Sequence, residues 1–468
     1  MIEKLEYADQ TLVHPVGLLL WLALAALLLT VRRSRAMIPI FVLACFIPPA
    51  QRVSVAGLDF TLLRLLLVVG WLRVLGGGEQ KGLRLLAIDR VILAYAFVSS
   101  VANIAVFGST AAVVYNLGIT FDVLASYFLV RVLVRNFEDV DSAIRGLIWI
   151  AIVVSVPFLL ERYVEPHRNI FSVFGGIDEI TSARQGKVRA QGAFPHSILA
   201  GCFWAATLPL ILAHFWTQPG RRALTVAGLV AALLIIFACA SSTPLAGAFA
   251  AIGAAAFFRF RRHLRLVRWG TAFGLLGLHL VMKAPVWHLV SRIDLVGGST
   301  GWHRYHLIDQ AIKRFPEWGL IGTRSTAHWG YGLFDVTSQY VYEGVRGGIL
   351  TLALFVATIA LAYRGVGRVL RATPESRSRR ILAWMLGAAL FTHMGMFIAV
   401  SYFGQMYLIW YFTLAAIASL EEFGLGKLDR ARWSRPRRRV AASPRLLLSA
   451  EAPAAISSSA PASPASGS

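Results

Sequence analysis

The sequence predicts an all-α fold, a polytopic transmembrane helix bundle of about 12–13 spans with a long, partly helical extracytoplasmic loop. Three observations carry this prediction. Hydrophobic residues make up 57% of the 468 residues and charged residues only 15%, whereas soluble domains are about half apolar and about a quarter charged. Apolar runs close to the ~20 residues that cross a bilayer recur along the chain. Basic residues gather in every second connector between these runs.

The apolar runs follow one another from residue 15 to residue 420. Run 37–50 is short for a full crossing at about 1.5 Å per residue, so we expect a tilted, broken or re-entrant piece there. The runs are 15–31, 37–50, 57–76, 88–107, 111–131, 143–161, 193–216, 223–240, 243–258, 266–284, 347–363, 381–400 and 404–420.

Alternate connectors are strongly basic, for example 32–35, 221–222 and 259–268. The positive-inside rule places such connectors in the cytoplasm, which puts the N-terminus outside and the C-terminus inside. Two connectors of the opposite set are long, namely 162–192 and 286–346. We therefore expect extracytoplasmic structure, and any chemistry, in these two segments, since long loops in compact folds are usually functional or disordered.

The net charge of +22 has the same origin. Because the basic residues lie in connectors between spans, the charge indicates membrane topology and not nucleic-acid binding. The three cysteines all lie in apolar runs. We interpret them as small buried hydrophobes and not as a disulfide framework.

The membrane domain is predicted to cover residues 1–424, including both long outer loops. Residues 425–468 form a separate basic juxtamembrane segment followed by an Ala/Pro/Ser-rich cytoplasmic tail. The basic block, Lys427 to Arg439, is expected to contact anionic lipid of the bilayer. The remainder cannot bury enough apolar surface to order itself, so we expect disorder there.

Several arginines fall on the predicted outer side, where the positive-inside rule does not explain them. Two interpretations are open. An arginine at the mouth of a span can extend to lipid headgroups, or it can bind an anion, because guanidinium groups match phosphate oxygens in pairs and stay charged. The second interpretation predicts an anionic ligand such as a lipid pyrophosphate. The candidate residues are Arg162, Arg189, Arg292, Arg304 and Arg324.

Four segments follow one another in an order that is typical of one family. They are 189–197 (RAQGAFPHS), 241–243 (SST, at a span start), 304–322 (ending FPEWGLIG) and 337–348 (TSQYVYEGVRGG). Together with the long late loop, they resemble the O-antigen ligase and O-antigen polymerase superfamily of bacterial membrane glycosyltransferases, which includes exopolysaccharide polymerases. The resemblance covers roughly residues 35–420.

The resemblance implies an inner-membrane glycosyltransferase of cell-surface polysaccharide assembly that works on the periplasmic side. The donor would be an undecaprenyl-pyrophosphate-linked glycan and the acceptor a second glycan or a lipid. No cofactor or metal is expected, and the outer segments contain neither D-x-D nor a ligand cluster with metal spacing. The arginines would hold the pyrophosphate, and Tyr340, in the tyrosine position of the fourth segment, would contact the substrate.

One position departs from the ligase pattern. The family's fourth segment opens with a histidine that is proposed to assist the acceptor hydroxyl, whereas Thr337 stands here. A threonine hydroxyl can form hydrogen bonds but cannot act as a base near neutral pH. Asp335 or His328 could replace the base, or the reaction could depend on positioning and charge alone. The catalytic candidates are therefore Asp335, His328 and Thr337.

Two other classes of function remain open on the sequence. A transporter or flippase of lipid-linked sugars would place polar residues in several spans, and a non-catalytic partner of polysaccharide-assembly proteins could keep the fold without the base. Arg64 and Asp122 lie within predicted spans. Ionisable groups at such depth indicate function by default, and Arg64 is expected either to pair with a carboxylate or to face a cavity.

Overall fold

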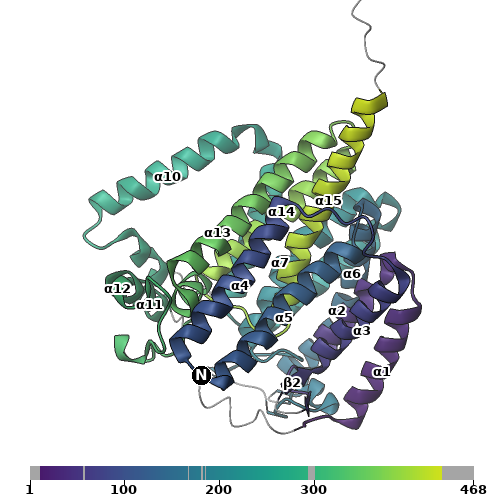
Figure 1. Ribbon diagram of the computed structural model, residues 1–468. Coiled ribbons are helices and arrows are strands. Elements are labelled where there is room, and N and C mark those ends of the chain that lie inside the picture. The colour runs from purple at the N-terminus through teal and green to yellow at the C-terminus, as the bar shows by residue number, and fades with distance from the viewer. Residues whose placement is uncertain are drawn as a thin grey trace, which may run out of the picture. The chain divides into compact units, whose positions relative to one another are not determined.

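The computed structural model describes residues 11–434 except 56–57, 167, 181–182, 185 and 293–300, and only the backbone of 427–434. The described chain is predominantly helical, as predicted (Figure 1). The helices are α1 (Pro15–Thr30), α2 (Met37–Phe46), α3 (Leu62–Gly77), α4 (Ala87–Phe107), α5 (Thr110–Leu133), α6 (Phe137–Leu159), α7 (Ser197–Thr217), α8 (Arg222–Ala238), α9 (Ser242–Ala256), α10 (Leu264–Val281), α11 (Gly301–Lys313), α12 (Phe315–Trp318), α13 (Gln339–Ala372), α14 (Arg377–Phe397) and α15 (Met406–Ser434).

Nine helical segments of the described chain are long and apolar enough to cross a bilayer, so the protein is a multi-pass membrane protein. The number is lower than the predicted 12–13. Helices α1, α2 and α3 have only 16, 10 and 16 residues, and a 3-10 turn (Phe257–His263) joins α9 to α10 in one segment, Ser242–Val281. The short α2 agrees with the expectation of an incomplete crossing at 37–50.

Two small antiparallel hairpins interrupt the helical fold, which the all-α prediction did not include. Strand β1 (Arg52–Val55) pairs with β2 (Leu58–Thr61), and β3 (Ala183–Arg184) pairs with β4 (Lys187–Val188). β2 leads straight into α3, where the Thr61 hydroxyl accepts a hydrogen bond from the Arg64 amide and caps the helix.

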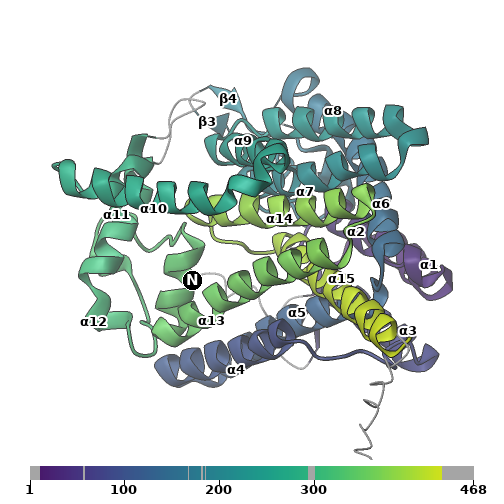
Figure 2. The same cartoon turned by 90° about the horizontal axis from the view of Figure 1, so that it is seen from above.

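Helices α7 and α15 are the most enclosed candidate spans of the described chain (Figure 2). Sixteen of the 21 residues of α7 are buried, and Trp204 is fully enclosed. No residue of α7, and none of residues 406–420 in α15, is exposed, which is the pattern of helices surrounded by other helices. In contrast, no residue of α10 is buried, and α10 lies at the edge of the bundle (Figure 1).

The connectors alternate between two ends of the bundle. We call the end that carries segments 160–196 and 282–338 the loop end, and the opposite end, which carries 134–136 and 373–376, the basic end. The loop end is the predicted outer side. Its segment 282–338 forms a small separate core together with Val345 of α13; the segment contributes Leu307, Ala311, Trp318, Trp329 and Leu333.

The outer segment ends earlier than its predicted limit of 346, because α13 already begins at Gln339. Backbone groups of the preceding loop bind into α13: Thr323 donates to the Val345 carbonyl at 2.8 Å, and Ile349 donates to the Gly319 carbonyl at 2.8 Å. These bonds replace helical ones at a kink, where Gly348 has a φ of +75° that favours glycine. The kink therefore results from the packing of the loop against the helix.

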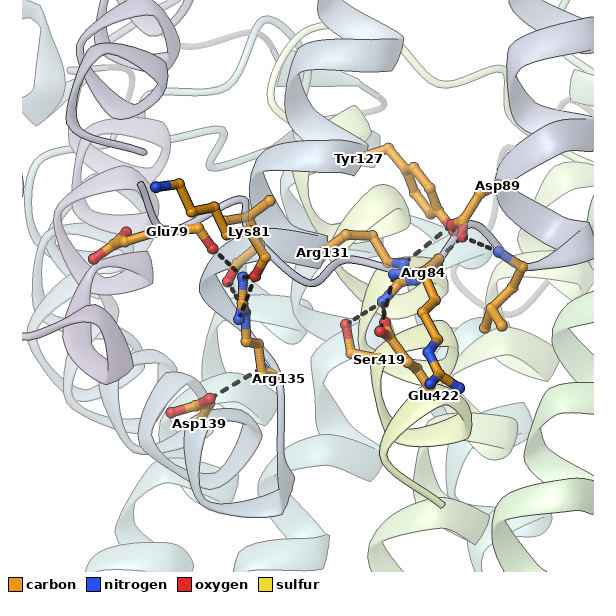
Figure 3. Close-up of polar contacts among 12 residues, drawn as sticks. Glu79, Lys81, Arg84, Asp89, Tyr127, Arg131, Arg135, Asp139, Ser419 and Glu422 are labelled. Atoms are coloured by element: carbon orange, nitrogen blue, oxygen red, sulfur yellow. Dashed lines mark hydrogen bonds and ion pairs between the residues drawn. The ribbon is translucent and has the colours of Figure 1, made fainter. Parts of the chain in front are cut away.

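The basic end is fastened by arginines that have carboxylate partners (Figure 3). Arg131 on α5 is 1% exposed and donates five hydrogen bonds, two of them to Asp89 on α4. The other three go to Ser419 and Glu422 on α15 and to the Arg84 carbonyl. Tyr127 also donates to Asp89, at 2.6 Å. This network joins α4, α5 and α15.

Helix α15 continues past the predicted domain boundary at residue 424, to Ser434. Residues 435–468, which contain the end of the predicted basic block and the predicted disordered tail, lie outside the described residues, as do the side chains of the basic block from Lys427 onward.

Candidate functional site

Arg304, in the first turn of α11, is the centre of the candidate site. Its side chain is buried, with only 6% of the residue exposed. Nε donates to the Ala399 carbonyl at 3.1 Å, and Nη2 donates to the Thr243 hydroxyl at 2.9 Å. Both acceptors are neutral, and Arg304 forms no ion pair within the described part of the chain. The guanidinium is held in place without being neutralised.

Arg189, on the segment between β4 and α7, is likewise buried without an ion-pair partner in the described part of the chain. It is 7% exposed, and its Nε is buried without a hydrogen-bond partner. The backbone on both sides is fixed: the Ala190 amide donates to the Ala238 carbonyl at 3.1 Å, and Glu161 accepts from the Gln191 amide at 3.0 Å. Segment 189–197 thus holds a second buried arginine on a rigid backbone.

The charges of Arg184, Arg189 and Arg304 act on one another. Burial, together with the positive charges of Arg184 and Arg189, lowers the pKa of Arg304. Burial and the charge of Arg184 likewise lower the pKa of Arg189. Arginine nevertheless stays protonated at any physiological pH. The loop end therefore contains a positive cluster of two buried arginines, Arg189 and Arg304, with the exposed Arg184 near them, and burial and mutual repulsion favour the binding of an anion.

His196 adds a neutral group to this cluster. Its Nδ1 accepts a hydrogen bond from the Ile198 amide at 3.1 Å and caps α7. Desolvation, reinforced by the positive charges of Arg189 and Arg184, lowers the pKa of His196 to about 4. The ring is then neutral at physiological pH, and the hydrogen bond to Nδ1 assigns the proton to Nε2. His196 can donate one hydrogen bond from Nε2 to a ligand.

The fourth segment packs against the same end of α14 as Arg304 does. The Ser338 hydroxyl donates to the Phe397 carbonyl at 3.2 Å, and the Tyr340 hydroxyl donates to the Met394 carbonyl at 3.3 Å. Arg304 binds the Ala399 carbonyl two residues further on. The Thr337 hydroxyl oxygen is buried and has no hydrogen-bond partner. Residues 394–399 therefore bring Arg304, Thr337 and Tyr340 into one region.

A histidine lies beside the position where the family pattern expects one. His303, the neighbour of Arg304 on α11, has Nε2 3.3 Å from the backbone carbonyl oxygen of Asp335. The carbonyl can only accept, so this contact assigns the proton to Nε2 and leaves Nδ1 as an acceptor. Asp335 itself has an exposed side chain. Its carbonyl, two residues before Thr337, orients the imidazole ring.

The other predicted residues lie apart from the cluster. His328 is bound through Nε2 to Glu317 at 2.7 Å. Hydrogen bonds from His328, Trp329 and Arg314 lower the pKa of the Glu317 carboxyl to about 2. Arg324 is exposed and donates to the Val106 carbonyl at 2.7 Å.

Two further arginines of the predicted set share no contact with the cluster. Arg162 lies over the ring of Tyr163, 5.7 Å from its centroid. Arg292 is exposed at the end of a 3-10 turn (Val286–Arg292). Among the described residues, no group of three His, Cys, Asp or Glu side chains is arranged to hold a metal ion.

Sequence reasoning did not select four residues of this region as site residues, namely Arg184, His196, Thr243 and His303. His196 and Thr243 lie inside the first two family-like segments, and His303 precedes the third. Their position in or next to those segments could have been used to select these three residues from the sequence. Nothing in the local pattern distinguishes Arg184 from the other charged residues of its loop.

The fold and the cluster define a multi-pass membrane protein with a group of uncompensated arginines at its loop end. No protein-family model matches the chain, and no curated protein matches it significantly. The resemblance to the O-antigen ligase and polymerase superfamily therefore stays a prediction.

Proposed function

We propose that the protein is a bacterial inner-membrane glycosyltransferase that polymerises or ligates cell-surface glycans from an undecaprenyl-pyrophosphate donor. One observation carries the proposal: Arg304 and Arg189 are both buried at the loop end, close enough for their charges to interact, and neither has a carboxylate partner within the described chain. A buried charge without a partner is costly. An anionic ligand that binds between the two residues removes this cost.

Pyrophosphate matches this cluster in charge and in geometry. Guanidinium groups bind phosphate oxygens in pairs and remain charged. When the glycosidic bond breaks, negative charge grows on the pyrophosphate oxygen, and donors already fixed in position stabilise it without rearrangement. Arg304 is held by Thr243 and Ala399, and the Nε2–H of neutral His196 supplies a further donor. The polyprenyl chain would contact apolar helix surfaces.

His303 is the residue best placed to act as the base. The acceptor hydroxyl oxygen attacks the anomeric carbon, its proton passes to Nδ1 of His303, and the bonding electrons leave with the pyrophosphate. The Asp335 carbonyl holds Nε2–H and thereby keeps Nδ1 available. The unpartnered Thr337 hydroxyl is a candidate to hold the acceptor by a hydrogen bond. Transfer of the proton is typically worth about 10²–10⁴ in rate.

The orientation belongs to the same proposal. The loop end faces the periplasm and the basic end faces the cytoplasm, as the positive-inside rule predicts. Counting α1, α2 and α3 as tilted or partial crossings, and α9 and α10 as two, gives the predicted thirteen spans. The N-terminus then lies outside, and the basic segment from Lys427 lies against anionic cytoplasmic lipid.

The test is gel analysis of lipid-linked and surface glycans in a deletion strain, complemented with the wild type or with His303→Gln. Single repeat units that accumulate on the carrier would indicate a polymerase, and full-length chains stranded on the carrier a ligase. His303→Gln keeps a donor for the Asp335 carbonyl but cannot accept the proton, so it should fail to restore product. An unchanged surface profile on deletion would contradict the proposal and favour transport. Full complementation by His303→Gln would favour catalysis by positioning alone or a non-catalytic assembly role.

A further inference from the structure

A cavity of about 180 Å³, whose lining includes no residue of the arginine cluster, lies between α2, α3, α5 and the start of α15. Connector residues at the loop end, among them Pro48, Pro49 and Gly404, form part of its wall. Most of the lining is apolar. Its polar side chains are Thr61, Arg64, Asp122, Ser126, Gln405 and Tyr407.

Arg64 and Asp122 form a two-pronged ion pair in the wall of this cavity. Nε donates to Oδ1 and Nη2 to Oδ2, each at 2.7 Å, and Nη1 donates to the Asp59 carbonyl at 2.7 Å. All three nitrogens of the guanidinium are therefore engaged. A carboxylate has about four lone-pair sites, of which Arg64 occupies two. The pair is neutral as a whole, and both partners keep unused capacity: about two lone-pair sites on Asp122 and two of the five N–H groups of Arg64.

Gln405 extends the same pattern. It is 2% exposed, and its Nε2 donates to the Ala193 carbonyl at 2.9 Å. Its Oε1 is buried without a hydrogen-bond partner. An unpartnered buried carbonyl is costly, so Gln405 gains a hydrogen bond if a donor from the cavity reaches this enclosed oxygen. Ala193 belongs to segment 189–197, so the residue that lines the cavity is bonded to the segment that carries Arg189.

We propose that this cavity binds one ring of an uncharged sugar. The two charged groups of the wall, Arg64 and Asp122, have opposite charges, so the cavity favours neither an anion nor a cation. The wall offers acceptor sites on Asp122 and donors on Arg64, Ser126 and Tyr407, which suits a sugar because each of its hydroxyl groups can both donate and accept. The apolar lining suits the faces of the ring. A cavity of about 150 Å³ is known to hold one benzene, which has six non-hydrogen atoms. A hexopyranose has twelve, so a cavity of about 180 Å³ takes the ring of one sugar with part of its substituents outside. The source of that sugar, a unit of the glycan under assembly, rests on the proposed function.

The experiment is saturation-transfer-difference NMR on the full chain in lipid nanodiscs. The probes are the methyl glycosides of glucose, galactose, mannose and N-acetylglucosamine at millimolar concentration. Gln405→Leu removes the unpartnered acceptor, and Ser126→Leu fills the cavity while leaving the ion pair intact. The matched control is Gln51→Leu. Gln51 lies at the same end and also donates to a backbone carbonyl, that of Phe174 at 2.6 Å, but it is outside the cavity lining.

We expect saturation transfer to at least one glycoside in the wild type and in Gln51→Leu, reduced about fivefold or more in Gln405→Leu and Ser126→Leu. Absence of transfer to all four glycosides in the wild type would overturn the proposal and leave a cavity that holds water. Equal transfer in all four proteins would also overturn it, because binding would then occur elsewhere. Arg304→Ala should retain the signal, so the sugar site and the glycosyltransferase proposal can fail independently.

Discussion

Arg131 and Arg304 are equally well buried, but their surroundings are opposite. At the basic end, Arg131 is 1% exposed and donates five hydrogen bonds, with two carboxylates among the acceptors. At the loop end, Arg304 is 6% exposed and donates two, both to neutral oxygens. Burial of an arginine alone therefore says little about its role. The presence or absence of a carboxylate partner separates a structural arginine from a candidate ligand site.

This difference also explains why counting charges in loops was only partly informative. The positive-inside rule accounts for arginines at the basic end, and the structure gives Arg131 and Arg33 carboxylate partners there, Asp89 and Asp139. At the loop end, position alone selected five arginines as candidates for anion binding. Arg324 and Arg162 have local contacts of their own.

The largest expected effect is on the structural arginine. Arg131→Ala leaves Asp89 buried without its counter-charge and removes the bonds to α15, so the free energy of unfolding should fall by about 3–5 kcal/mol. The measurement is thermal unfolding of the detergent-solubilised chain, with size-exclusion chromatography used to quantify the protein that remains folded after heating. The double variant Arg131→Met, Asp89→Asn removes both charges and should recover much of the loss. If Arg131→Ala is as stable as the wild type, the distinction between the two ends fails.

The second effect concerns activity. Arg304→Ala and Arg189→Ala should each lower glycan product by about 10²–10³-fold, because a fixed donor for the leaving pyrophosphate is lost, while membrane abundance stays at the wild-type level. Arg304→Lys keeps the charge but loses the paired hydrogen bonds of the guanidinium, so its activity should lie between those of the wild type and Arg304→Ala. The matched control is Arg324→Ala, an arginine of the same end that binds only the Val106 carbonyl. Full activity in both alanine variants of the cluster would contradict the pyrophosphate site.

Hydropathy located the helices but not their partners. Each of the thirteen predicted runs contains a helix, because apolar length is a local property of the chain. The contact of His303 with the Asp335 carbonyl joins positions 32 apart, and that of Arg131 with Ser419 joins positions 288 apart. The hydrophobic periodicity of a short stretch of sequence gives no information about such long-range contacts. The kink at Gly347–Gly348 and the β1–β2 hairpin depend on neighbouring backbone in the same way.

The candidate site was predicted in its principal charges and not in its geometry. Arg189 and Arg304 were both selected, and the structure brings them together. His328 was selected as a base, and the structure binds it to Glu317 instead. The sequence distance from a histidine to Thr337 was a poor guide, because the turn of α11 that carries Arg304 also places His303 beside Asp335.

A third prediction tests binding without catalysis. Farnesyl pyrophosphate, a short analogue of the lipid carrier, should stabilise the wild type by about 1.4 kcal/mol at ten times its Kd. Thermal unfolding of the full chain measures the shift. Farnesol, which lacks the pyrophosphate, should have little effect. The shift should disappear in Arg304→Ala and remain in Arg324→Ala; a shift retained in Arg304→Ala would place the anion elsewhere.

The smallest expected effect is a dependence of stability on pH through His196. Its pKa is about 4 in the folded chain and 6.5 without the neighbouring arginines and desolvation. Between pH 6.5 and 4 the unfolded chain binds a proton that the folded chain does not, so the stabilising contribution is complete above pH 6.5 and is lost as the pH falls towards 4. Because His196 is exposed, solvent screening limits the loss to about 1 kcal/mol.

His196→Asn isolates this contribution, since asparagine also caps a helix but does not titrate in this range. Unfolding measured from pH 7 to 4 should show a shallower loss of stability for this variant than for the wild type. A bound pyrophosphate should reduce the same difference, because its negative charge offsets Arg189 and Arg184 and raises the pKa of His196 towards its ordinary value. An equal pH dependence in both proteins would mean that the loop-end arginines do not act on His196. The field of an uncompensated cluster, which is what sets this end apart from the basic end, would then be too weak to select an anion.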